Sequence, residues 1–555
     1  MTLDFFYGLY TIKPRGDIEL INRNSNDFTG IACLLFLLAA GTVFASGKQA
    51  PENPALGTSL VTKNGPIKGV QQDGIYVYKG IPYAKAPVGD LRFAPPQDVE
   101  PWTDVLDCTK YGPMISQWLT FPISVDNKKQ SEGALILNVW TPAEPQKADK
   151  LPVYVFIHGG GFGFGTGSQN TLNGTSFAQN GVVTVTINYR LSTLGFFASN
   201  ETYKQYGTTG NWGLLDQIKA LEWIRDNIED FGGDPAQVTI GGESAGSYSV
   251  SALILSPQAE GLFHGAIMES GTILSLQSSL PQARGDLQKS IEASQALADV
   301  FGVSDTEEGL KHLRQVDPYV LNYLSPFMMN QASILPPFYL MPVFDGAVLP
   351  KDPVAALHEG NFNKVNLLIG FNHDEGTLFI PSTVDDSFYE SYGSRMVGEG
   401  WPVIAERFPV DENNTAAQRT QQVLAYSWFT AGSKVFADTL AHNNSVFMYN
   451  YNFAAPGNPL GAYHAGEIPH VFNTVGESAS EESKKVAQEM HTRWINFIKN
   501  GDPNSGVTLP SATQWPKYDP EKPEVIFFDT EVTAGTLPDQ ENLDFVAQVL
   551  YGTTE

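Results

Sequence analysis

A serine flanked by glycines is the residue of this sequence most suited to chemistry. Gly242-Glu-Ser-Ala-Gly246 follows residues 237–240, which are typical of a short buried strand, and precedes the small apolar residues 247–255, which suit a helix. A G-x-S-x-G pentapeptide between a strand and a helix is typical of a nucleophile elbow. The serine of that turn has an unfavourable backbone conformation for a residue with a Cβ, and the two glycines leave room for the neighbouring elements. We therefore predict that Ser244 is a nucleophile.

A nucleophilic serine also needs hydrogen-bond donors for the negative charge that develops on the substrate oxygen. Gly159-Gly160-Gly161 directly follows the apolar run 151–157. Three glycines can turn backbone N–H groups inward without side chains that crowd the substrate. Two of them, with the N–H of Ala245 at the helix start, are predicted to form a three-donor oxyanion hole. A plain glycine-rich turn is the alternative.

A base and a carboxylate must complete the site, and in this type of fold they follow the serine in the order acid, then histidine. Asp374 and Glu375 follow the apolar run 365–370, and the pattern alone does not separate them. His464 and His470 both follow the run 446–451, in a loop suited to a base. Three other histidines are excluded as the base by their places in the chain: His158, His442 and His491.

The elements that must position these residues alternate between strands and helices. Apolar runs predict buried parallel strands at 151–157, 182–188, 365–370 and 446–451. Periodic stripes predict helices at 214–228 and 481–499, and residues 280–345 have helical patterns that we interpret as a capping insertion. Turn signals at Asn64-Gly65 and Asp73-Gly74 break a β-rich stretch, whereas 79–93 is predicted to be irregular. The order indicates a doubly wound α/β fold with a large, mostly parallel sheet, whose sites lie beyond the carboxyl ends of the strands.

Composition and charge narrow the function classes. The chain has 555 residues, 42% hydrophobic and 17% charged, a net charge of -26 and a pI near 4.7. The acidic balance argues against a nucleic-acid partner, because phosphates call for a basic face. No Cys/His or paired-His spacing indicates a metal, and no cofactor is predicted.

An apolar run at residues 31–45 divides the chain into two predicted parts. Fifteen residues is the size of the apolar core of a signal peptide and is short for a membrane helix. We expect residues 1–45 to be an extension with a cleaved export signal and 46–555 to be a single secreted or periplasmic domain. An uncleaved membrane anchor is the alternative.

These motifs, taken in order, resemble those of the type-B carboxylesterases, the family of bacterial para-nitrobenzyl-type esterases, fungal lipases and animal cholinesterases. The matching runs cover about residues 58–550 and are Gly80-Ile-Pro-Tyr-Ala, Arg92-Phe93, Leu137-Asn-Val-Trp140, His158-Gly-Gly-Gly-Phe162, Gly210-Asn-Trp-Gly-Leu-Leu-Asp-Gln217, Phe231-Gly-Gly-Asp-Pro235, Gly241 to Gly246, Asp374-Glu-Gly376 and His464. The resemblance implies an α/β-hydrolase fold and hydrolysis of carboxylic esters through an acyl-enzyme, with a small-molecule ester as substrate.

The resemblance also assigns roles residue by residue. It implies Ser244 as nucleophile, Glu375 as acid and His464 as base, with the oxyanion donors Gly160, Gly161 and Ala245. Glu243 matches an acidic residue of the family's active-site gorge, and we place it with Phe162 and Trp118 as candidate pocket residues, core packing being the alternative for the aromatic ones. Two further matches resemble structural ion pairs of the family: Arg92 with Glu132, and Arg190 with Asp216.

Departures from the family pattern bear on the substrate. Ile115 stands where the family often has a cysteine, so the disulfide around the following loop is absent, and we expect a looser loop. Residues 124–130 contain no aromatic residue that could stack on choline, which makes choline esters doubtful substrates. Two alternatives to a soluble esterase are a lipase, with 280–345 as an interfacial lid, and a non-catalytic binding protein on the same scaffold.

Overall fold

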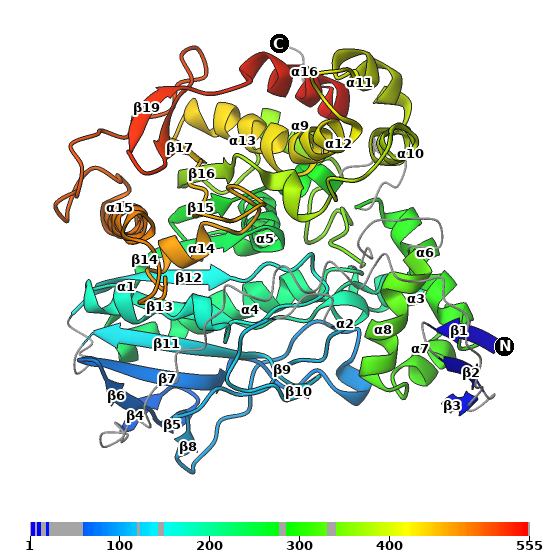
Figure 1. The fold of residues 1–555 in the computed structure, drawn as a ribbon. Coiled ribbons are helices and arrows are strands. Elements are labelled where there is room, and N and C mark those ends of the chain that lie inside the picture. The colour runs from blue at the N-terminus through cyan, green and yellow to red at the C-terminus, as the bar shows by residue number, and fades with distance from the viewer. Residues whose placement is uncertain are drawn as a thin grey trace.

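Eleven strands form one twisted sheet through the middle of the computed structural model (Figure 1). Their spatial order is β19 (Thr533–Thr536), β18 (Glu524–Phe528), β17 (Val446–Tyr451), β16 (Asn366–Asn372), β15 (Gly265–Glu269), β14 (Gly233–Glu243), β12 (Leu151–Ile157), β13 (Val183–Ile187), β11 (Ile136–Pro142), β7 (Ile75–Pro82) and β6 (Val70–Gln72). The strands from β13 to β18 pair in parallel, and antiparallel strands complete both edges. The prediction of a large, mostly parallel sheet is confirmed.

The structure describes residues 59–552 except 119–122, 143–148, 277–284 and 330–339, and the side chains of 325–329 are also outside the description. Near the N-terminus it describes the backbone of three antiparallel strands, β1 (Thr2–Phe5), β2 (Gly8–Ile12) and β3 (Ile18–Ile21). The predicted export signal at 31–45 lies outside the described residues. Within the described part of the chain, no helix has the length and apolarity to span a membrane.

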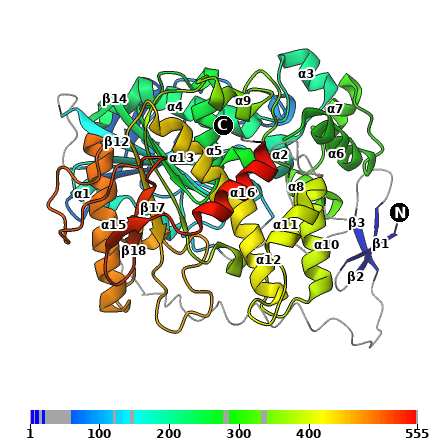
Figure 2. The same cartoon turned by 90° about the horizontal axis from the view of Figure 1, so that it is seen from above.

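Helices cover both faces of the sheet (Figures 1 and 2). Contacts place α1 (Thr175–Gln179) and α15 (Glu481–Asn500) against the strands on one side, and α4 (Trp212–Asn227), α5 (Ala245–Leu255) and α13 (Ala431–Ala441) also pack on the sheet. The alternation along β12 explains the arrangement. Val153, Val155 and Ile157 belong to one buried cluster and Tyr154 and Phe156 to another. A strand that is apolar on both faces needs cover on both.

The remaining helices lie mainly to one side of the sheet, in two groups (Figure 2). The described part of the predicted capping insertion is helical, as expected, with α6 (Leu287–Asp299), α7 (Glu307–Leu313) and α8 (Pro318–Met329). A second group was not predicted and consists of α10 (Asp386–Val397), α11 (Trp401–Arg407), α12 (Ala416–Ala425) and α16 (Gln540–Tyr551). The shorter helices are α2 (Ser192–Phe196), α3 (Asn200–Tyr206), α9 (Pro353–His358) and α14 (Ile468–Val471).

The first β-rich stretch has the predicted turns but ends later than predicted. β4 (Ser59–Thr62) and β5 (Gly65–Lys68) flank the turn at Asn64-Gly65, and β6 and β7 flank the turn at Asp73-Gly74. The prediction of irregular structure from Lys79 is wrong for the first four residues, because β7 continues to Pro82 beside β11. A register shift between Leu137 and Val139 accommodates Gly80 there, at a φ of 74°.

The loop that lacks the family's disulfide is closed by hydrogen bonds. Met114–Ile115 (β9) pairs in parallel with Gln130–Ser131 (β10). Gln117 adds a bond from its N–H to the Gln130 side chain at 2.8 Å. Cys108, a free thiol, is buried elsewhere in the core. The strand pair thus supplies a closure at the base of this loop.

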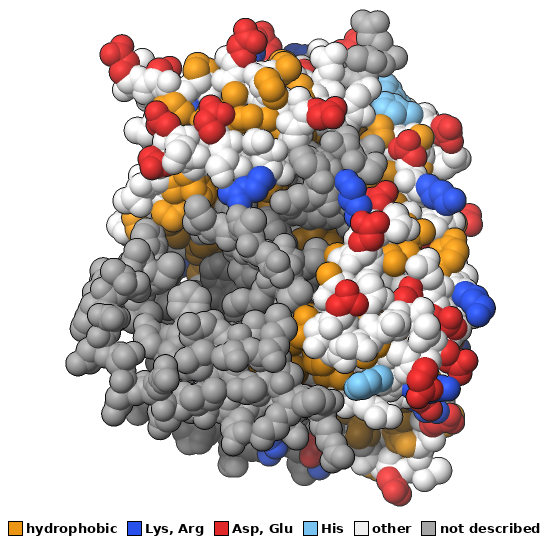
Figure 3. All heavy atoms as spheres, turned by 90° about the vertical axis from the view of Figure 1, so that its right-hand side faces the viewer, with side chains coloured by type: hydrophobic (Ala, Val, Ile, Leu, Met, Phe, Trp, Pro, Cys, Tyr) orange, Lys and Arg blue, Asp and Glu red, His pale blue; other side chains and the backbone are white. Residues whose placement is uncertain are grey.

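The acidic balance of the sequence is visible on the surface. Figure 3 shows Asp and Glu side chains over the described part of one face, with fewer Lys and Arg between them. The large grey area of that view belongs to residues that are not described.

Candidate active site

Ser244 lies on a sharp turn between β14 and α5, at the carboxyl end of the sheet. Its φ is 55° and its ψ is -122°, a strained conformation for a residue with a side chain, and its N–H donates to the Glu269 carbonyl at 2.9 Å. A Cβ on Gly246 would lie 2.0 Å from the Ile157 oxygen, and one on Gly242 would lie 2.4 Å from the Gly246 carbonyl carbon. The turn therefore requires glycine at both positions, as the sequence pattern predicts.

The Ser244 side chain is not used by the fold. It does not cap α5, although it occupies the N-cap position, and it is partly exposed. Its hydroxyl makes no hydrogen bond to any residue that the structure describes. The oxygen is therefore available to react.

The glycine loop after β12 packs directly against this turn. A Cβ on Gly159 would lie 3.1 Å from the Ser244 Cβ. Gly160 and Gly161 have φ values of 108° and 60°, and neither N–H donates to another described residue. Ala245 is the first residue of α5, and the first N–H of a helix has no partner within it. Among the described residues, the N–H groups of Gly160, Gly161 and Ala245 thus have no partner, and the glycine loop and the start of α5 both adjoin Ser244.

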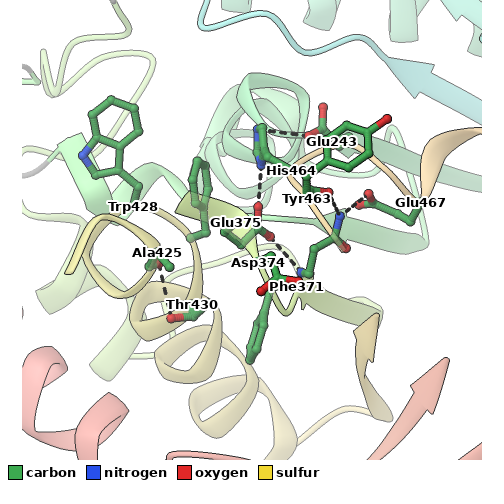
Figure 4. Close-up of polar contacts among 12 residues, drawn as sticks. Glu243, Phe371, Asp374, Glu375, Ala425, Trp428, Thr430, Tyr463, His464 and Glu467 are labelled. Carbon is green, nitrogen blue, oxygen red and sulfur yellow. Dashed lines mark hydrogen bonds and ion pairs between the residues drawn. The ribbon is translucent and has the colours of Figure 1, made fainter. Parts of the chain in front are cut away.

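His464 lies in the segment between β17 and α14. Its Nδ1 is 2.6 Å from Glu375 Oε2, and Figure 4 shows the two side chains pointing toward each other. Glu375 follows β16, is fully buried, and accepts the N–H of Asn372 on Oε1 at 2.8 Å. A carboxylate on Nδ1 fixes the proton there and leaves Nε2 as the basic nitrogen.

The geometry separates the candidates that the pattern left open. Asp374 does not contact His464; it accepts the Ala462 N–H at 2.8 Å and contacts the His373 ring at 2.9 Å. His470 points away, with Nε2 3.0 Å from the Ser483 hydroxyl, and burial lowers its pKa to about 4. His464 and Glu375 are the pair that the structure brings together.

The other two histidines near the core have internal partners. His158 stacks on Tyr189 with ring centroids 4.6 Å apart, and burial lowers its pKa to about 4. His491 Nδ1 donates to the Val471 carbonyl at 2.7 Å while Nε2 meets the Ser176 hydroxyl, and its pKa is also lowered by burial to about 4. Both remain neutral at neutral pH.

Hydrogen bonds join the loop after β16 to the loop that carries His464. Asp374 and Tyr463 form a parallel bridge, Asp374 N–H donates to the Ala462 carbonyl at 3.0 Å, and Thr377 donates to the Leu460 carbonyl at 2.7 Å. Asn372 donates its side-chain amide to the Tyr463 carbonyl at 2.8 Å. The acid and the base, 89 residues apart in the chain, are thereby held together.

Glu243 approaches the other nitrogen of the base. Its Oε1 lies 3.1 Å from His464 Nε2, close enough for an ion pair if the imidazole is protonated, but without hydrogen-bond geometry. Burial, followed by the nearby Glu375 and Glu269, holds the pKa of Glu243 well above its usual range. Glu243 thus lies beside the base as a buried acid, and its surroundings favour its uncharged form.

Several residues around the base were missed by the sequence reasoning. Phe429 stacks on the His464 ring at 4.3 Å between centroids, and Phe379 packs on it at 5.1 Å. Phe429 lies in a π-helical turn, Tyr426–Thr430, in which the Thr430 hydroxyl donates to the Ala425 carbonyl (Figure 4). Such turns are frequent at functional sites, but no residue pattern in the sequence marks one.

Two buried glutamates near the base were also missed. Glu269 accepts the Trp494 indole N–H at 2.7 Å, and burial raises its pKa to about 8, although the Trp494 bond opposes the rise. Glu467 accepts the Asn372 amide at 2.6 Å. Glu269 ends β15, a strand that was not predicted, and Glu467 lies in the loop between β17 and α14, where no residue pattern marks it.

The two aromatic pocket candidates lie in packed surroundings. Phe162 is buried against Phe196 and Tyr248, with a φ of 60° in the glycine loop. Trp118 packs on Tyr323 of α8 at 4.4 Å between ring centroids. Core or surface packing accounts for these contacts without a substrate.

The ion pairs implied by the resemblance are present and buried. Arg92 bonds Glu132 with Nη2 to Oε2 at 2.7 Å, and Arg190 bonds Asp216 with Nη2 to Oδ1 at 2.7 Å. Within the described residues, no three His, Cys, Asp or Glu side chains are placed to hold a metal ion.

A cleft of about 640 Å³ lies elsewhere, between α13 and α16, and includes Lys434, Asp438 and Asp544 in its lining. Its lining contains no serine beside a histidine. The chemistry, rather than the size of the opening, therefore places the candidate active site at Ser244.

Comparisons with known proteins agree with this geometry. The model of the carboxylesterase family matches residues 57–546. The para-nitrobenzyl esterase of Bacillus subtilis is 33% identical over 87% of this chain and 97% of its own length, and liver carboxylesterase 1F of Rattus norvegicus is 35% identical over 88% and 92%. A solved para-nitrobenzyl (PNB) esterase superposes with a TM-score of 0.77 at 32% identity, over 88% of this chain and 99% of that one. The protein therefore belongs to the carboxylesterase family, has the α/β-hydrolase fold and is a carboxylic ester hydrolase.

Proposed function

We propose that the protein hydrolyses carboxylic esters through an acyl-enzyme on Ser244. Ser244 Oγ attacks the ester carbonyl while His464 Nε2 takes its proton, and Glu375 stabilises the imidazolium through Nδ1. The backbone N–H groups of Gly160, Gly161 and Ala245 stabilise the oxyanion. His464 then gives the proton to the departing alkoxide, and the alcohol leaves.

Water completes the cycle by the same route. His464 takes a proton from water as its oxygen attacks the acyl carbonyl, and the proton passes to Ser244 Oγ when the acid is released. The observation that carries this mechanism is the 2.6 Å contact of His464 Nδ1 with Glu375 Oε2, in a site whose serine hydroxyl and glycine N–H groups have no other role among the described residues.

An uncharged ester is the substrate that the site favours. Phe379 and Phe429 cover the base with apolar rings. Burial favours the uncharged form of Glu243, which weakens the attraction that a cationic alcohol group would feel there. Residues 124–130 have no aromatic ring for such a group, and the similar proteins include para-nitrobenzyl esterases.

Ser244→Ala tests the nucleophile. We expect kcat on p-nitrophenyl acetate to fall by about 10⁶, because no other described hydroxyl is placed to replace it. The matched control is Ser256→Ala, at the other end of α5, whose hydroxyl has no hydrogen-bond partner among the described residues. Near wild-type turnover by Ser244→Ala would exclude this mechanism, and a thermal melt of each variant checks folding.

A further inference from the structure

The site contains more buried acids than its one base can balance. Glu243, Glu269, Glu375 and Glu467 are each 5% exposed or less. Their only ion-pair partner among the described residues is His464. Buried carboxylates without a cation take up protons rather than remain charged, because desolvation disfavours the charged form.

Among these four acids, Glu467 has the least stabilisation for a negative charge. Burial, followed by the proximity of Glu243, Glu269 and Glu375, holds its pKa well above its usual range. The other titratable groups that face it are tyrosines whose own pKa values are raised, first by burial: Tyr449, Tyr451 and Tyr463. None of these neighbours supplies a positive charge.

Asn372 joins Glu467 to the catalytic pair. It is the last residue of β16, and its N–H donates to Glu375 Oε1 at 2.8 Å. Its side-chain amide donates to the Tyr463 carbonyl at 2.8 Å and to Glu467 Oε2 at 2.6 Å. One residue thus contacts the acid, the residue before the base, and Glu467.

Two acceptor atoms in this group have no partner. Asn372 Oδ1 and Glu467 Oε1 are buried and make no hydrogen bond to the described residues. Two unpaired acceptors are costly, whereas a proton on Glu467 removes the charge and turns one acceptor into a donor. An amide beside an uncharged acid suits these surroundings better than an amide beside a carboxylate.

We propose that Asn372 and Glu467 form a positioning pair, an amide and an uncharged acid, that holds the loop carrying His464 in register with Glu375. The pair acts through His464 and does not touch the substrate. Its amide fixes the Tyr463 carbonyl, and Glu467, three residues beyond His464, fixes the other side of the base. This inference rests on the function proposed above.

Asn372→Asp tests the pair, because it keeps the shape and removes both amide hydrogens. We expect kcat on p-nitrophenyl acetate to fall by about 10–100-fold with KM within about threefold, because a small displacement of the base weakens the chemical step more than binding. The acid limb of the pH–rate profile should move to lower pH, since a base displaced from Glu375 loses part of the carboxylate contact that favours the imidazolium. A purely structural role would lower stability without moving that limb.

The swap Asn372→Asp with Glu467→Gln restores one amide and one acid in the opposite order. We expect it to recover about tenfold of the loss, because residues in one hydrogen-bond network are strongly coupled. The recovery is partial, since a protonated aspartate has one hydrogen and the asparagine had two. Asn496→Asp is the control: Asn496 is fully buried and its amide also donates to two acceptors, the Pro503 and Val507 carbonyls.

Each rate is divided by the fraction of enzyme that a fluorophosphonate labels at Ser244, found by mass spectrometry. A swap no faster than Asn372→Asp, or Asn372→Asp with the kcat and pH profile of the Asn496 control, overturns the positioning pair. Labelling that misses Ser244 in the wild type overturns the proposed nucleophile instead. The two failures are therefore distinguishable.

Discussion

The two halves of the candidate site are positioned by different forces. Around Ser244 the main chain sets the position of the side chain. The turn is strained, with a φ of 55°, and a Cβ added to Gly246 would lie 2.0 Å from the Ile157 oxygen. Around His464, hydrogen bonds between side chains and backbone hold the loop in place, and they involve the side chains of Asn372, Asp374 and Thr377. The nucleophile is placed by excluded volume and the base by polar contacts.

This difference implies different responses to substitution. Close contact with backbone cannot relax without moving a strand or helix, because protein interiors are close-packed. A hydrogen bond at a loop can be lost while the loop keeps its other contacts. Substitutions around Ser244 should therefore abolish folding or activity, whereas substitutions around His464 should reduce activity only in part.

Gly246→Ala should give the largest effect. The added methyl group meets the Ile157 carbonyl of β12, so either the elbow or the centre of the sheet must move. We expect no folded enzyme, or a loss above about 4 kcal/mol in the free energy of unfolding. Urea denaturation and yield of soluble protein measure it.

Gly476→Ala is the matched control, because within the described part of the chain its Cβ would meet only the Ser478 hydroxyl, at 3.9 Å. It should fold and turn over like the wild type. A Gly246→Ala enzyme with normal stability and activity would contradict the idea that excluded volume places Ser244.

The same contrast explains what could be predicted from the sequence. Excluded volume selects glycine, and glycine at fixed spacing is visible, so the turn at Ser244 and the loop at Gly160 and Gly161 were found from residue types. The buried strand before each was found from its apolar run: β12 has the predicted bounds, whereas β14 contains the predicted 237–240 but is longer. The strand β15 was missed, because its five residues carry no clear signal beside the longer runs.

Hydrogen bonds between distant loops leave no comparable pattern in the sequence. The pattern could not separate Asp374 from Glu375 or His464 from His470, and family resemblance was needed to choose. Only the fold brings the end of β16 beside the loop that carries His464. A polar Asn372 at the end of an apolar strand was visible, but its partners were not.

Asp374→Ala should give an intermediate effect in the base half. It removes the acceptor for the Ala462 N–H, two residues before the base, while Thr377 and Asn372 still hold the loop. We expect kcat/KM to fall by about tenfold and the free energy of unfolding by about 1–2 kcal/mol. Steady-state kinetics and urea denaturation check both.

The control for this variant is Asp411→Ala, which removes a carboxylate acceptor of backbone N–H groups at the surface, those of Asn413 and Asn414. Its kcat/KM should equal that of the wild type. Complete unfolding of Asp374→Ala would erase the distinction between the two halves, as would an unchanged kcat/KM.

Glu269→Gln should act through the pH dependence of stability, and it concerns a buried acid directly beneath the Ser244 turn. The Glu269 carbonyl accepts the Ser244 N–H, while its buried carboxyl, with a pKa raised to about 8 from an ordinary 4.5, accepts the Trp494 indole. Between these values the folded state keeps a proton that the unfolded state releases, so stability falls as pH rises from about 5 to 8. Glutamine does not titrate, so the unfolding free energy of the variant should decline less steeply with pH, by up to about 1.4 kcal/mol per pH unit.

Urea denaturation from pH 5 to 9 measures the slopes, with the exposed Glu406→Gln as control. Equal slopes for Glu269→Gln and the wild type would mean that Glu269 is ionised beneath the elbow and that charge, besides excluded volume, acts on Ser244.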